Sequence, residues 1–170
     1  MRVNRIHRAV VTGVERLTPG MMRVAFGGEG LADFTSSGVG DEYFRLFFPH
    51  EGETEPALPT PTDDGYWEYP EDVDPAPLRT YTVRAWDEAS GILTVDFVVH
   101  QGGVAAAWAL AARPGDVVGV NTPTALYAAP EDIEWQAPGG RCDRPPGRAE
   151  ACRERAPRRA HSRGPRGRGR

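Results

Sequence analysis

Lysine is absent from this sequence, and cysteine and long apolar runs are scarce. All 20 basic residues are arginine, and the two cysteines, Cys142 and Cys152, lie in a segment rich in proline and glycine. Their spacing fits no common zinc pattern and two thiols make no disulfide framework, so no metal site is predicted. The first residues have no apolar signal-peptide core and no later run reaches the length of a membrane span. We therefore expect a soluble, cytoplasmic protein without a membrane partner.

Acidic and basic residues are separated along the chain. The net charge of −4 hides −12 over residues 1–136 and +8 over residues 137–170, where 11 arginines meet only three acids. Residues 137–170 also contain no Ile, Leu, Val, Met, Phe, Tyr or Trp, so they have nothing to bury against a sheet. These observations predict one folded domain over residues 1–136, followed by a disordered basic tail over residues 137–170.

Residues 1–136 are mainly β in pattern. Six apolar or aromatic-rich runs predict strands at Arg8–Thr18, Met21–Gly28, Asp41–Pro49, Arg79–Trp86, Ile92–His100 and Gly115–Pro123. One short α-helix is predicted in the alanine-rich run after Gly102-Gly103, and Pro114-Gly115 ends it. Six antiparallel strands suggest a closed barrel, because closure removes exposed strand edges.

Residues 51–77 differ from the rest of the predicted domain. They contain nine acids and six prolines, a composition that does not suit a regular element. We predict a long surface loop here. Two roles stay open for it, a solvated acidic loop and a lid or partner-docking segment.

The strand that begins at Arg79 carries an unusual set of polar side chains. Arg79 and Tyr81 share one face of a strand, whereas Thr80 and Thr82 share the other. A guanidinium suits forked pairing with a phosphate, a phenol ring suits a planar ligand, and a Thr82 group suits the polar rim of that ligand. The same residues also suit an ordinary solvated strand, so this pattern alone leaves both interpretations open.

The predicted helix opens on two glycines in the run HQGGVA. Glycines leave the first backbone N–H groups of a helix uncovered, and those groups add to the positive end of the helix dipole. This order of strand, strand, glycine turn and helix favours a site for a phosphate or pyrophosphate.

The runs described above, taken together, resemble those of a known family, the siderophore-interacting proteins. The resemblance is carried by RTYTVRAWDEASGILTVDFVVH, GGVAAAWALAARPGDVVGV and YAAPEDIEWQ, with GGEGLADFTSSGVGDEYFRLFFP matching the earlier strands, and it covers about residues 5–136. It implies a six-stranded antiparallel Greek-key FAD-binding barrel of the ferredoxin-reductase type, which in the family precedes an α/β domain that binds NAD(P)H. The family's cytosolic enzymes pass electrons from NAD(P)H through the flavin to an imported ferric siderophore, and the weaker Fe(II) complex releases its metal.

The resemblance also implies which residues bind FAD, whereas no side chain is predicted to be catalytic because the flavin supplies the chemistry. The implied cofactor-binding residues are Arg79, Tyr81, Thr82, Val98, Val99, His100, Gly102, Gly103, Val104, Ala105, Ala106 and Trp108. The first three surround the isoalloxazine, the glycines form the pyrophosphate turn, and many relatives carry Ser or Thr near Ala106. Two residues keep a structural alternative, His100 as a cap at the strand end and Trp108 as a core residue under the helix rather than an adenine neighbour.

The resemblance stops at Gln136, where the family continues into apolar strands. A frameshift in a GC-rich gene is the simplest explanation of residues 137–170, and an evolved basic tail for nucleic acid or anionic lipid is the other. Either way an NAD(P)H site is expected to be missing, so we expect a poor NAD(P)H-dependent reductase.

The sequence thus predicts the FAD-binding domain of a siderophore-interacting oxidoreductase, a monomer whose substrate is a ferric siderophore. The alternative is a non-catalytic flavin- or siderophore-binding module, so whether this chain is an enzyme stays open. A nucleic-acid binder is disfavoured by the acidic body of the chain.

Overall fold

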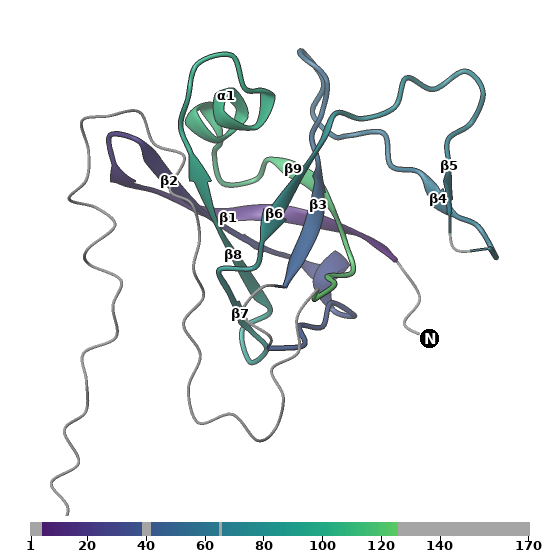
Figure 1. Ribbon diagram of the computed structural model, residues 1–170, viewed down its shortest axis with the longest axis horizontal. Coiled ribbons are helices and arrows are strands. Elements are labelled where there is room, and N and C mark those ends of the chain that lie inside the picture. The colour runs from purple at the N-terminus through teal and green to yellow at the C-terminus, as the bar shows by residue number, and fades with distance from the viewer. Residues whose placement is uncertain (1–4, 39–41, 65, 126–170) are drawn as a thin grey trace, which may run out of the picture. The chain divides into compact units, whose positions relative to one another are not determined.

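The computed structural model describes residues 5–38, 42–64 and 66–125 (Figure 1). The predicted disordered tail over residues 137–170 lies outside the described residues, as do residues 126–136 of the predicted domain. Within the described ranges, no helix is both long and apolar enough to cross a membrane.

Seven strands of the described chain form one antiparallel sheet. They are β1 (Ile6–Thr18), β2 (Met21–Gly27), β3 (Tyr43–Phe47), β6 (Leu78–Thr82), β7 (Ala85–Asp87), β8 (Ile92–Val98) and β9 (Val117–Asn121). Their order across the sheet is β6-β3-β9-β1-β2-β8-β7, and every neighbouring pair is antiparallel. The prediction of a mainly β, antiparallel fold is confirmed, with one of the six predicted strands divided into β6 and β7.

The predicted strand that is divided into β6 and β7 nearly closes the sheet into the predicted barrel. β6 and β7 are the two edges of the sheet, yet only Val83 and Arg84 separate them in the chain. The Val83 N–H donates to the Glu42 carbonyl beside β3 (2.9 Å), and the Arg84 N–H donates to the Thr94 carbonyl of β8 (3.1 Å). A bent strand therefore brings both edges together, although β6 and β8 share no hydrogen-bonded ladder and the sheet is not fully closed.

The core fills the interior of this curved sheet. In β8, Leu93, Val95 and Phe97 are buried while the residues between them are more exposed, the alternation expected for a strand with one apolar face. Full burial of a side chain of this size contributes roughly 1.5–3 kcal/mol to folding. The buried cluster contains Ala9, Val11, Met22, Val24, Phe26, Leu31, Phe34, Phe44, Leu46, Phe48, Leu93, Val95, Phe97, Ala105, Ala109, Val118 and Val120.

A 3₁₀-helix, η1 (Glu29–Leu31), packs closely against β1. A Cβ atom at Gly30 would lie 2.1 Å from the Arg8 carbonyl oxygen, so only glycine fits there. The buried His7 ring places Nδ1 3.2 Å from the Gly30 carbonyl oxygen and meets the Phe34 ring edge-on, with the ring centres 5.6 Å apart. These contacts fasten η1 to the sheet.

The acidic segment, residues 51–77, contains a small hairpin where the sequence predicts only a loop. β4 (Thr60–Pro61) pairs with β5 (Trp67–Glu68). Both strands have only two residues, and Pro61 of β4 has no backbone N–H to donate. A forked ion pair between Arg8 and Glu55 attaches the segment to β1.

The acidic segment also covers the outer face of β3 and β9. The Leu58 side chain packs on Gly119 so closely that a Cβ atom there would lie 2.2 Å from Leu58 Cδ2. The Trp67 ring meets the Phe47 ring edge-on at 5.5 Å. This cover accounts for the burial of every residue of β9, which has the core on its other side.

Candidate cofactor-binding site

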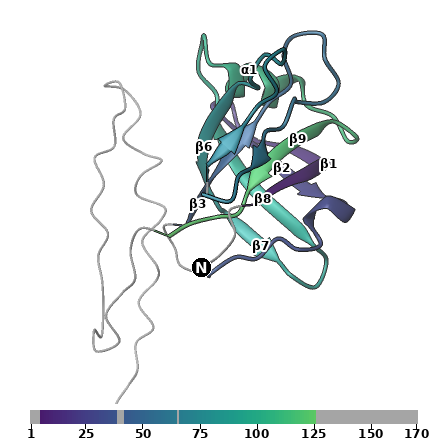
Figure 2. The same ribbon diagram turned by 90° about the vertical axis from the view of Figure 1, so that its right-hand side faces the viewer.

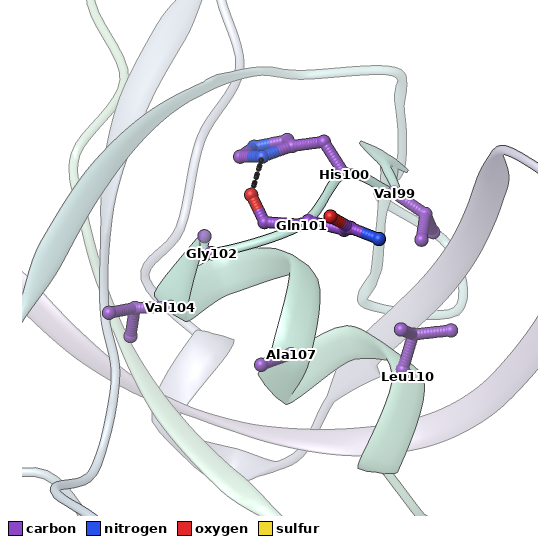
Figure 3. A pocket seen from close by; sticks show the side chains of 8 residues that line it. Val99, His100, Gln101, Gly102, Val104, Ala107 and Leu110 are labelled. Carbon is purple, nitrogen blue, oxygen red and sulfur yellow. Dashed lines mark hydrogen bonds between the residues drawn. The ribbon is translucent and has the colours of Figure 1, made fainter.

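The end of β8, a glycine turn and the helix α1 (Val104–Ala111) form a cavity of about 600 Å³. In both views α1 lies at one end of the sheet and β7 at the other (Figures 1 and 2). The cavity is lined by Val99, His100, Gln101, Gly102, Gly103, Val104, Ala107 and Leu110 (Figure 3). Gln101, Ala107 and Leu110 are not among the residues predicted from the sequence.

The glycine turn presents backbone donors to this cavity. Gly102 has a φ of 77°, in the left-handed region that side chains disfavour. Gly103 precedes the helix in an extended conformation and provides no side-chain cap, while its carbonyl accepts the Ala107 N–H at 2.9 Å. The N–H groups of residues 104–106 therefore have no acceptor within the helix and add to the positive end of its dipole.

The His100 ring lies over the glycine turn. A Cβ atom at Gly103 would lie 2.4 Å from His100 Cε1, so the ring occupies the space that the missing side chain leaves. His100 Nδ1 is 3.2 Å from the Gln101 carbonyl oxygen (Figure 3). The exposed imidazole is thus held beside the uncovered N–H groups of the helix.

The remaining predicted residues lie on the buried side of α1. Ala105 and Ala106 are buried and do not line the cavity, so their side chains are not available to a ligand there. Trp108 packs under the helix against three core rings, with its ring centre 5.3 Å from that of Phe48, 5.9 Å from Phe97 and 6.1 Å from Phe26. Its position matches the core alternative, and its side chain does not line the cavity.

Arg79 and Tyr81 lie on the face of β6 that turns toward the interior. The register places Tyr81 opposite the buried Phe44, and the Tyr81 ring centre lies 4.5 Å from that of Phe97. Burial raises the pKa of the Tyr81 phenol, and the nearby Arg79 charge only partly offsets this, so the phenol is neutral and able to donate. Arg79 is exposed, with one guanidinium nitrogen donating to the Leu78 carbonyl at 2.7 Å.

The other edge of β6 offers free backbone groups. The Val83 N–H donates to the Glu42 carbonyl, and the Phe48 N–H donates to the Pro77 carbonyl at 2.8 Å. Backbone groups alternate in direction along a strand, so those of Thr80 and Thr82 point away from β3. No strand among the described residues pairs with them.

The structure therefore brings the predicted site residues together in two neighbouring groups. One group lines the cavity, and the other lies on β6, whose Tyr81 touches Phe97 of β8. Four predicted residues belong to neither group, since Val98 is 62% exposed at the end of β8 and the other three lie on the core side of α1: Ala105, Ala106 and Trp108.

Comparison with known proteins gives an independent finding. Residues 10–127 match the family model of the siderophore-interacting FAD-binding domain. The NADPH-dependent ferric-chelate reductase of Escherichia coli K12 is 40% identical over 132 residues, which are 78% of this chain and 50% of that protein. The ferric vibriobactin reductase ViuB of Vibrio cholerae is 30% identical over 141 residues, 81% of this chain and 51% of that protein. The chain thus spans about half the length of these curated relatives.

Solved structures show the same likeness in three dimensions. A siderophore utilization protein from T. fusca matches with a TM-score of 0.62 and 34% identity, over 76% of this chain and 49% of that one. The siderophore-interacting protein SipS from Aeromonas hydrophila matches with a TM-score of 0.57 and 25% identity, over 72% and 44% of the two chains.

Proposed function

Because the chain belongs to the family of siderophore-interacting FAD-binding domains, with FAD as its cofactor, we propose that it carries the flavin of a ferric-siderophore reductase. When bound, FAD supplies the redox chemistry, since it accepts a hydride from a nicotinamide and gives up electrons singly to Fe(III). The names of the Escherichia coli and Vibrio cholerae relatives support a ferric chelate as substrate. We extend the proposal to a monomer that acts in the cytoplasm.

The observation that carries this proposal is the glycine turn at the N-terminus of α1. Three successive backbone N–H groups without a side-chain cap lie at the N-terminus of α1, where Gly102, Gly103 and Val104 line a cavity of about 600 Å³. Such a donor set suits the pyrophosphate of FAD. Gly102 and Gly103 let the backbone approach those oxygens closely, and Val104, Ala105 and Ala106 contribute their N–H groups.

We assign the isoalloxazine to the free edge of β6. Its polar rim needs hydrogen-bonding partners, which the backbone groups of Thr82 supply. The neutral Tyr81 phenol donates, and the exposed Arg79 guanidinium binds a phosphate or the electron-rich end of the ring system. Val98 and Val99 follow the ribityl arm between the two groups of residues, whereas Trp108 acts only by supporting the helix.

The test measures binding first and electron transfer second. Full-length chain is titrated with FAD, and binding near one equivalent is expected from flavin fluorescence. The loaded protein is then reduced anaerobically with dithionite and mixed with ferric citrate or a ferric tris-catechol complex, while a chelator reports Fe(II). We expect faster Fe(II) formation than an equal concentration of free reduced FAD gives. FAD binding without that acceleration contradicts the reductase proposal, and the absence of FAD binding contradicts the site itself.

A further inference from the structure

Glu42 is a buried acidic residue directly before β3, and the proposed function gives it no role. Only 1% of its surface is exposed. Both carboxylate oxygens accept hydrogen bonds, Oε2 from the Ser36 hydroxyl at 2.5 Å and Oε1 from the Ser37 N–H at 2.6 Å. The Ser36 oxygen itself accepts the Gly38 N–H at 3.0 Å, so the hydroxyl proton points to Glu42. A carboxyl group that accepts on both oxygens is suited to carry its negative charge.

No cation in the described part of the chain pairs with this carboxylate. The ion pairs there involve Asp33, Glu55, Asp74 and Asp96 instead. Burial of a charge without a counter-ion is unfavourable, and hydrogen bonds from two neutral donors offset this only in part. A neutral side chain at this position avoids that penalty, so the stability of the fold does not explain why the residue is charged.

Glu42 lies next to the strand end at which the isoalloxazine is proposed to bind. Its carbonyl accepts the Val83 N–H at 2.9 Å, and the next residue, Tyr43, is paired with Thr82. Residues opposite each other in an antiparallel ladder have Cα atoms about 5 Å apart. The free backbone groups of Thr82 point to the other edge of β6, so Glu42 lies on the far side of the strand from the proposed flavin. A buried charge at this range is screened little by water.

We propose that the Glu42 carboxylate lowers the reduction potential of the bound flavin, so that the loaded protein is a stronger reductant of Fe(III). The inference rests on the proposed function, in which the isoalloxazine lies along β6. At neutral pH and above, two electrons and one proton convert the oxidised ring system to a reduced form that carries one negative charge. A fixed negative charge nearby disfavours that added charge. A chelate that holds Fe(III) much more tightly than Fe(II) is hard to reduce, and a lower flavin potential favours its reduction.

A structural role for Glu42 predicts different behaviour. The carboxylate fastens the Ser36–Gly38 segment, and the Glu42 carbonyl holds the bend at Val83. If this is its whole role, changes to Glu42 lower the melting temperature or the FAD affinity, and loss of the Ser36 hydrogen bond has the same kind of effect. If the charge acts on the flavin, the potential changes even where FAD stays bound.

The experiment measures the flavin potential of the full chain loaded with FAD. The protein is titrated anaerobically with dithionite beside a redox dye of known potential, and the absorbances give the equilibrium between flavin and dye. Glu42→Gln removes the charge but keeps the shape, since its oxygen accepts the Ser37 N–H and its nitrogen donates to the Ser36 oxygen. We expect this variant to shift the equilibrium toward reduced flavin by roughly tenfold, which is about 30 mV for a two-electron couple.

Two control variants separate the charge from its surroundings. Ser36→Ala removes a hydrogen bond to Glu42 and keeps the charge. Glu88→Gln removes a charge that is exposed in the turn between β7 and β8. The equilibrium with the dye is expected to stay within about twofold of the parent in both controls, because the buried charge is retained in each and an exposed charge is screened.

The outcomes separate this inference from the proposed function. An unchanged potential in Glu42→Gln with FAD bound, or equal shifts in Glu42→Gln and Ser36→Ala, overturns the role of the charge and leaves FAD as the cofactor. If Glu42→Gln does not fold, the double variant Ser36→Ala/Glu42→Met decides, because it replaces both partners by apolar groups of similar size. An unchanged potential in that double variant overturns the inference, and an increase supports it. A parent protein that does not bind FAD contradicts the proposed function instead.

Discussion

Arg79 is the charged residue of β6, a strand whose other edge pairs with no strand in the described part of the chain. If it binds FAD as proposed, Arg79→Ala removes at least one charge-assisted hydrogen bond. Such bonds are worth about 1.5–3 kcal/mol, so we expect FAD affinity to fall by roughly tenfold or more. Arg5→Ala is the control, because Arg5 is also exposed but pairs with Asp33. Equal FAD affinity in the Arg79 variant and the parent removes Arg79 from the site.

The contact between His100 and Gly103 allows a test of the two roles considered for His100. Gly103 has an extended backbone that alanine also adopts, so Gly103→Ala acts mainly by pushing the His100 ring away. If the ring contacts FAD, Gly103→Ala and His100→Ala should each weaken binding, roughly twofold to tenfold for one neutral hydrogen bond. The double variant should be no weaker than either single one, because both remove the same contact. A loss of melting temperature with unchanged FAD affinity favours the purely structural role.

At the scale of elements, the strands can be predicted from their apolar alternation, but the exposed side of α1 cannot. Alternation in runs such as Ile92–Val98 identifies a strand with one buried face. The run Val104–Ala111 has apolar residues in all directions, so nothing in its spacing tells which side meets the core. For this reason the sequence leaves Trp108 open between the core and the cofactor, and gives no signal that Leu110 lines the cavity. The sequence does not predict β4 and β5, because each has only two residues and the surrounding segment is rich in proline.

The junction of β1 with η1 gives a prediction about pH. Burial lowers the pKa of His7 from its ordinary value near 6.5, and the Gly30 hydrogen bond and Asp33 only partly oppose this. The folded state therefore favours neutral His7. Its contribution to stability is fully present above pH 6.5 and is lost as the pH falls from there toward the lowered pKa. We expect the melting temperature of the parent to fall more than that of His7→Gln between pH 7.5 and 5.5. Parallel melting curves of the two proteins over this range contradict the prediction.

At the scale of the whole molecule, the acidic segment behaves as a second layer over the sheet. Trp67 holds it there through the Phe47 ring, and the Arg45 guanidinium lies 5.2 Å from the Trp67 ring centre. Trp67→Ala should lower the free energy of unfolding by about 1–3 kcal/mol, measured in urea, since a partly buried aromatic contact is lost. The matched control is Tyr66→Ala, because Tyr66 is 73% exposed and should change little. Equal effects of the two changes indicate a loosely attached loop, which is one of the two roles that the sequence leaves open.

The unpartnered edge of β6 also has a consequence for how the protein behaves in storage and during synthesis. An exposed row of backbone donors and acceptors is a template onto which a strand of another molecule can add. In this chain the groups concerned belong to Thr80 and Thr82, where the flavin is proposed to lie. If the flavin lies there as proposed, cofactor loading covers these groups in the described part of the chain and prevents such strand addition. Chains that lack FAD are expected to self-associate at concentrations where loaded chains sediment as single molecules.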